Sequence, residues 1–174
     1  MKPRLIKTEA AIGMTLDDLH NLVCAFGENE FAQQGAAPFM WVIQKGNNLA
    51  WLETPWENDP EKYASTEFIR AMLKELNADR YSFMTEAWVA VENYEKGGKL
   101  PTRDIVPPSQ RPANERDDVL MIYSFERSGK YQMTRYKVTI RAHGQNYLGP
   151  RCDEPPTDQA GGEMWNLFQP PKRF

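Results

Sequence analysis

The sequence has few of the residues that usually carry catalysis, with two histidines and two cysteines among 174 residues. The motifs GxxxxGK[ST], GxGxxG, HExxH, G-x-S-x-G and CxxC are all missing, so no common phosphate-binding or catalytic signature is present. No apolar run reaches eighteen residues, which excludes a membrane-spanning helix, and the amino terminus lacks the apolar core of a signal peptide. We therefore expect a cytoplasmic protein with reduced cysteines and no cofactor.

The charge balance selects no class of partner, because a formal net charge of −3 is small for this length. An acidic balance argues against a general phosphate-binding protein. The length suits one compact domain, which buries roughly 70% of the surface of its unfolded chain.

The apolar pattern predicts an α+β fold, mainly an antiparallel sheet with one long and one short helix packed on one face. The short helix is expected to begin after the N-cap Thr15 and to end at Gly27. The long helix should follow Asp59-Pro60 and run to residue 77. Strands are expected at residues 4–8, 39–44, 49–53, 81–92, 118–126 and 131–141.

The stretch 118–142 predicts a central hairpin that turns at Ser128-Gly129, since glycine accepts the positive φ of a two-residue turn. The pairs predicted on its apolar face are Val119 with Val138, Met121 with Tyr136, Tyr123 with Thr134 and Phe125 with Gln132. A slip by one residue would turn the cations of the second strand into the core, so we expect burial to enforce this register.

Three cations, Arg135, Lys137 and Arg141, share the opposite side of the second hairpin strand. Cations beside aromatic residues are typical of nucleic-acid binding, which makes a nucleic-acid-binding module one alternative function. The alternative is structural pairing with carboxylates, in which Glu86 on the neighbouring predicted strand 81–92 is the expected partner of Arg135 or Lys137. The overall acidic charge favours structural pairing.

Carboxylates on adjoining predicted strands suggest a second alternative, a metal-dependent phosphoester hydrolase. Glu86, Asp118 and Glu126, with Lys137 nearby, are the residue types that bind Mg²⁺ and a phosphate in nucleases. Asp118 and Glu126 stand at opposite ends of one strand, so Glu86 would have to join one of them.

The four potential zinc ligands are His20, Cys24, His143 and Cys152. Structural zinc sites use closely spaced pairs on turns, and this set has no such spacing. We expect no metal site here, and we expect Cys24 to be a packed thiol rather than a nucleophile.

Two segments are poor in regular pattern. Residues 94–117 form a long proline-containing connection, either a lid or partner-binding loop or a plain spacer. Residues 143–174 are predicted to be an irregular Pro/Gly-rich extension of a domain that spans 1–142. The extension contains the apolar residues Trp165, Leu167 and Phe168, which should pack on the domain itself or on a partner.

Three phrases in the sequence, Glu86-Ala87-Trp88, Pro108-Ser109…Pro112 and Asp117-Asp118-Val119-Leu120, occur in this order within residues 80–142. They resemble small uncharacterised proteins of bacteria and their phages, in which an E-A-W strand precedes a P-S-x-x-P loop and a D/E-V-hydrophobic strand. The resemblance implies no activity. It implies that Glu86 and the 108–112 loop matter together.

The leading hypothesis is a non-enzymatic, protein-binding or regulatory protein of the cytoplasm, of phage or mobile-element origin. Its partner would be another protein, or a second copy of the chain in a homo-oligomer. The binding residues would be Arg135, Lys137, Arg141, Trp165, Leu167 and Phe168. The two alternatives are the hydrolase and the nucleic-acid-binding module.

Overall fold

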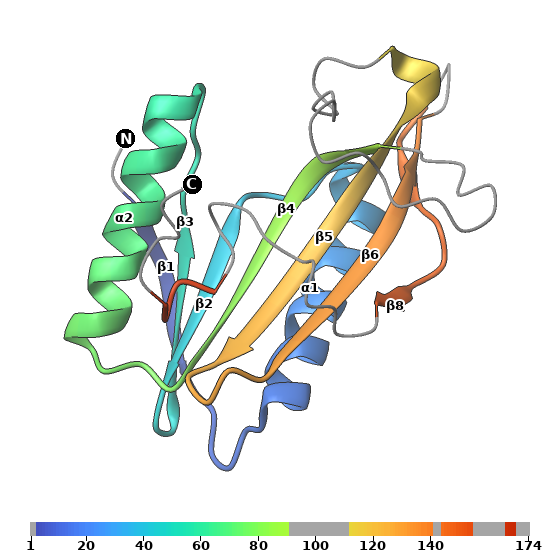
Figure 1. Cartoon of the computed structure of the whole chain (residues 1–174). Helices are drawn as coiled ribbons and strands as arrows, with labels where there is room; N and C mark the ends of the chain where they lie inside the picture. The colour runs from blue at the N-terminus through green and yellow to red at the C-terminus, as the bar shows by residue number, and fades with distance from the viewer. Residues whose placement is uncertain (1–2, 91–111, 141–143, 155–165, 170–174) are drawn as a thin grey trace, which may run out of the picture.

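The structure, a computed structural model, describes residues 3–90, 112–140, 144–154 and 166–169 (Figure 1). The helices are α1 (Leu16–Gln34), α2 (Asp59–Glu75) and a 3₁₀ turn, η2 (Ala113–Glu115). The strands are β1 (Arg4–Ala10), β2 (Met40–Lys45), β3 (Asn48–Glu53), β4 (Arg80–Ala90), β5 (Arg116–Glu126), β6 (Tyr131–Thr139), β7 (Tyr147–Leu148) and β8 (Cys152–Glu154).

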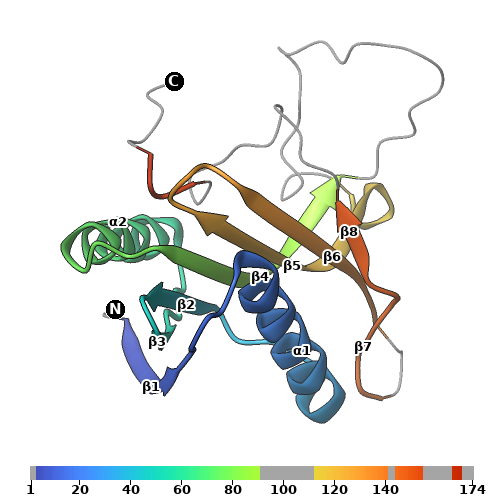
Figure 2. The same cartoon turned by 90° about the horizontal axis from the view of Figure 1, so that it is seen from below.

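The strands form an antiparallel sheet in the order β1-β3-β2-β4-β5-β6-β7, and β8 also pairs with β6. This confirms the predicted α+β class and the three-stranded set β4-β5-β6. The sheet curls around α1, which lies along its concave side (Figure 2). In the described part of the chain, neither helix is both long and apolar enough to cross a membrane.

The two helices pack on opposite faces of the sheet, so the prediction that both lie on one face is wrong. Val42 of β2 packs with the α1 residues Leu19 and Val23, whereas its neighbours Trp41 and Ile43 pack with the α2 side. Five consecutive residues of β2 are buried. Because successive side chains of a strand point to opposite faces, a strand that is buried at consecutive positions needs a cover on both faces.

Helix α1 begins as predicted but is longer. Thr15 and Asp18 form a capping box, in which the Asp18 amide donates to Thr15 Oγ1 at 3.2 Å and the Thr15 amide donates to Asp18 Oδ2 at 2.8 Å. Gly27 does not end the helix; Gly35 does, in the left-handed conformation. With 19 residues against 17 in α2, the helix expected to be short is the longer one.

Gly27 lies where the helix touches the sheet most closely. A Cβ atom added there would lie 2.8 Å from Sδ of Met84 and 3.2 Å from Cδ2 of Leu120. The residue is therefore a contact glycine rather than a cap glycine. Its small size sets how near α1 comes to β4 and β5.

The β5-β6 hairpin is shifted by one residue from the predicted register. The Glu126 amide donates to the Lys130 carbonyl and the Gly129 amide to the Glu126 carbonyl, each at 2.9 Å. The turn thus has three residues, with Gly129 at φ +96°. The observed pairs are Val119 with Lys137, Leu120 with Tyr136, Met121 with Arg135, Ile122 with Thr134, Tyr123 with Met133, Ser124 with Gln132 and Phe125 with Tyr131.

The shift leaves the inward face of β6 as predicted. Tyr136 and Val138 are buried against α1, but their companions are Leu120 and Ile122 instead of Val119 and Met121. Val119 through Ile122 are all buried, so β5 is apolar on both faces and either face can accompany Tyr136. Burial of apolar side chains therefore does not distinguish the two registers, and the three-residue turn determines which register forms.

We predict that Gly27→Val lowers the free energy of unfolding by about 2 kcal/mol, because extra methyl groups would force apart a packed helix-sheet contact. Urea unfolding followed by circular dichroism measures the change. The control is Ala25→Val, at an exposed position of the same helix, which tests helix propensity alone and should cost well under about 1 kcal/mol. Equal losses in the two variants would contradict close packing at Gly27.

Candidate functional site

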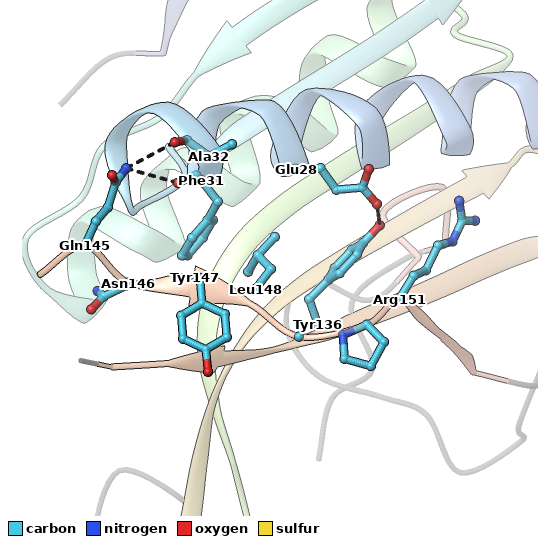
Figure 3. Close-up of a pocket in the computed structure, with 11 residues that line it drawn as sticks. Glu28, Phe31, Ala32, Tyr136, Gln145, Asn146, Tyr147, Leu148 and Arg151 are labelled. Carbon is cyan, nitrogen blue, oxygen red and sulfur yellow. Dashed lines mark hydrogen bonds between the residues drawn. The ribbon is translucent and has the colours of Figure 1, made fainter.

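A groove of about 570 Å³ lies between the second half of α1 and residues 145–151 (Figure 3). Glu28, Phe31 and Ala32 of α1 form one wall, and Tyr136 of β6 contributes to the lining. The opposite wall is the segment that contains β7. The groove has the size of a small-molecule or side-chain site.

The wall formed by residues 145–151 is attached to the domain at several points. The side-chain Nε2 of Gln145 donates to the Phe31 and Ala32 carbonyls, each at 3.3 Å, which satisfies acceptors at the end of α1. Leu148 pairs with Val138 of β6, and the Gly149 amide donates to the Lys137 carbonyl at 2.8 Å. These bonds hold the wall in place without a ligand.

One end of the groove carries groups of opposite charge. The Tyr136 hydroxyl donates to Oε1 of Glu28 at 2.7 Å, and Nε of Arg151 donates to Asp153 at 2.7 Å. Among the described residues, the second carboxylate oxygen of Glu28 and the two terminal nitrogens of Arg151 make no hydrogen bond. Burial, together with the hydrogen bond to Glu28, raises the pKa of Tyr136, so its hydroxyl stays protonated.

The other end of the groove is apolar and aromatic. Phe31 is buried beneath it, and Leu148 is half-buried. Tyr147 of β7 is 43% exposed, so a large aromatic surface is offered to solvent at the groove. A ligand could therefore meet apolar contact at one end and charged hydrogen-bonding groups at the other.

A buried polar chain lies beside the charged end. Ser82 Oγ is 2.8 Å from Ser124 Oγ, and Ser124 Oγ is 2.8 Å from Nδ1 of His20. Nε2 of His20 is 2.7 Å from Thr134 Oγ1, which in turn donates to Asp153. Since Thr134 donates to Asp153, it must accept from His20, so a neutral imidazole with its proton on Nε2 satisfies the chain.

This chain is structural rather than catalytic. Burial, and secondarily the charge of Arg151, lowers the pKa of His20 to about 4. Serine, histidine and aspartate are the residue types of a hydrolytic triad, but Thr134 separates His20 from Asp153. The Ser124 side chain is completely buried, so a substrate carbonyl could not reach its hydroxyl.

The carboxylates of the predicted hydrolase do not form one cluster: Glu86 lies opposite Leu120, two residues along β5 from Asp118, but Glu126 is remote from both. Oε1 of Glu86 accepts from the Ala37 amide at 2.8 Å, so it anchors the loop after α1. Glu126 pairs with Arg80 at 2.7 Å, at the opposite end of β5 from Asp118. Over the described ranges, no three His, Cys, Asp or Glu side chains are placed to hold a metal ion.

The two described cations of the predicted basic face, Arg135 and Lys137, have carboxylate partners. Lys137 lies 2.7 Å from Asp117 of β5, and Arg135 lies 2.9 Å from Glu154 of β8. The prediction that these cations pair with carboxylates is confirmed for Arg135 and Lys137, but the predicted partner, Glu86, was wrong. Arg141 lies outside the described residues.

The three potential zinc ligands that the structure describes do not form a metal site. His20 belongs to the buried polar chain, and Cys24 is buried in α1, where burial raises the pKa of its thiol. Cys152 is exposed on β8, and His143 lies outside the described residues. Both described cysteines are free thiols.

The two irregular segments are described only in part. Residues 94–111 lie outside the described residues, and so does most of the 108–112 loop that the resemblance links to Glu86. The sheet continues past residue 142 in β7 and β8. Leu167 is buried and Phe168 is half-buried against the domain, while Trp165 lies outside the described residues.

The residues that form the groove carry no signal in the sequence. Glu28 and Tyr136 are 108 positions apart, and Arg151 lies in a segment expected to be irregular. His20 does carry a signal in the sequence, since it falls between Leu19 and Val23 on the apolar stripe of α1. A polar residue on such a stripe indicates a buried hydrogen-bond partner.

Comparison with models of known protein families, with curated proteins and with solved structures finds no match to the chain.

We predict that the protein loses about 2 kcal/mol of stability between pH 7.5 and pH 5. His20 has a pKa of about 4 when folded, below its ordinary value of 6.5, so the unfolded chain binds the proton more readily. The stabilisation is complete above pH 6.5 and is lost as the pH falls toward 4. Urea unfolding across this range measures it.

The control is His20→Gln, which retains hydrogen-bonding groups but does not titrate. Its stability is lower at pH 7.5 and changes much less between pH 7.5 and pH 5. A wild-type protein with flat stability over this range would contradict a buried neutral His20.

Proposed function

We propose that the protein is a non-enzymatic binding protein of the cytoplasm that recognises a segment of another protein in the groove between α1 and residues 145–151. The observation that carries this proposal is the pair of exposed groups of opposite charge, Glu28 and Arg151, which keep hydrogen-bonding atoms unused by the described residues at one end of an aromatic groove. Such a combination suits a peptide, which offers charged, polar and apolar groups along one chain.

The chemistry of the groove specifies what the segment carries. The terminal nitrogens of Arg151 match a carboxylate, which can accept two parallel hydrogen bonds from a guanidinium. The remaining oxygen of Glu28 accepts from an amide or an ammonium group. Tyr147 and Leu148 offer contact to an apolar side chain. The expected ligand is a short segment with an acidic side chain next to an apolar one.

Several features favour binding over catalysis. The raised pKa values of Tyr136 and Cys24 leave a protonated hydroxyl and a protonated thiol, which are poor bases and nucleophiles. The groove wall is attached by hydrogen bonds before any ligand arrives. A preformed site loses little conformational entropy on binding, so a modest contact area suffices.

The test is an affinity capture from the native host with variants of the groove, followed by calorimetry with the captured partner. We predict that Arg151→Glu weakens binding at least about tenfold, since a charge-assisted hydrogen bond contributes about 1.5–3 kcal/mol. Tyr147→Ala, which removes an exposed ring, should weaken binding without loss of fold.

The matched control is Lys74→Glu, the same change of charge at an exposed position on α2. It should bind the partner as the wild type does. If the wild type, Arg151→Glu and Tyr147→Ala retain the same partner with equal affinity, the groove is not the binding site.

A further inference from the structure

The described part of the C-terminal segment, residues 166–169, lies on the α2 face of the sheet, opposite the groove. Leu167 is 2% exposed and belongs to the core cluster that contains Ile69 and Leu73 of α2. The Gln169 amide donates to the Asn166 carbonyl at 3.0 Å, so the four residues form a closed turn. Asn166 adopts φ +41°, a conformation that asparagine tolerates better than most residues.

Side chains of the domain hold the backbone of this turn. The Leu167 amide donates to the hydroxyl oxygen of Tyr81 at 2.7 Å. The Leu167 carbonyl accepts from Nη1 of Arg70 at 3.3 Å, and Arg70 also donates to the Gln169 carbonyl. The turn is thus bound through its peptide groups by two side chains, as a peptide ligand is, and not by a strand ladder.

The turn also presents an aromatic ring to the domain. The ring of Phe168 meets that of Tyr81 edge-on, with centroids 5.2 Å apart and planes 62° apart. The guanidinium carbon of Arg127 lies 5.2 Å from the centroid of Phe168. Both geometries are favourable contacts of aromatic rings.

Contacts within the domain position the receiving side chains. Tyr81 stacks on Phe125, with ring centroids 5.2 Å apart. Nε and Nη2 of Arg127 donate to the Ala78 carbonyl at 2.9 and 2.6 Å. These contacts do not involve residues 166–169, so Tyr81 and Arg127 have partners in the domain besides the turn.

We infer that Arg70, Tyr81 and Arg127 form a peptide-recognition site for a tight turn with adjacent leucine and phenylalanine. Residues 166–169 are its resident ligand in cis. The partner in trans is a protein segment that presents the same Leu-Phe turn. Eleven residues, 155–165, join the turn to β8, and a short tether gives a local concentration in the millimolar range, so the resident turn competes with any partner.

The test uses the full-length double variant Leu167→Ser/Phe168→Ser and a fluorescent peptide of residues 163–171. We expect this variant to bind the peptide, and the wild type to bind it at least about a hundredfold more weakly because its own turn occupies the site. A peptide with the same two serine substitutions should not bind. Fluorescence anisotropy measures all three.

Two further variants separate this site from the groove and from non-specific binding. Adding Tyr81→Phe to the double variant removes the hydroxyl that accepts from the Leu167 amide and should weaken peptide binding about twofold to tenfold. Adding Arg151→Glu should leave peptide binding unchanged. The inference is overturned if the double variant folds but does not bind the peptide, or if it binds the serine-substituted peptide equally well.

Should the double variant fail to fold, a wild-type chain with a specific protease site inserted between residues 158 and 159 is folded first and cleaved afterwards. We expect the released C-terminal fragment to exchange with the fluorescent peptide while the domain keeps its circular dichroism. A fragment that never exchanges, or a domain that unfolds as the fragment leaves, shows a core element instead of a ligand and overturns the inference.

Discussion

The contact between α1 and the concave side of the sheet is the constraint on which the rest of the structure depends. Gly27 allows the helix to approach β4 and β5 closely, and His20 hydrogen-bonds to Ser124 of β5 and Thr134 of β6 in the interior. A buried polar group that lost such partners would cost about 1–3 kcal/mol. These bonds therefore fix the position of α1 along the sheet, and with it the position of the groove wall two turns further on.

The alternation of side chains along the strands explains how one sheet supports two separate surfaces. Tyr136 points to the α1 face and lines the groove, whereas Tyr81 and Phe125 point to the α2 face and receive residues 166–169. The proposed partner site and the proposed turn site are thus back to back. Each is formed by side chains of the domain that are already held in place, which is the condition for binding at low entropic cost.

Part of the architecture could be predicted because it follows from local chemistry. The N-cap Thr15, the long apolar helix α2 and the strand β4 were each visible in a short window, and the α+β class followed from their order. The site could not be predicted in this way. Glu86 was paired with cations two strands away, but its oxygen accepts from the Ala37 amide, and a backbone group in a loop leaves no trace in the sequence.

What the sequence determined by itself is the identity of the elements from β1 to β6 and which side of β6 is buried, since periodicity and capping are properties of neighbouring residues. Only the tertiary structure decided the register of β5 against β6, the face that each helix covers and the residues that meet in the groove. The physical reason is that β2 and β5 are apolar at consecutive positions. Hydrophobic burial is then satisfied by several arrangements, and a three-residue turn, a glycine contact and a buried histidine select one.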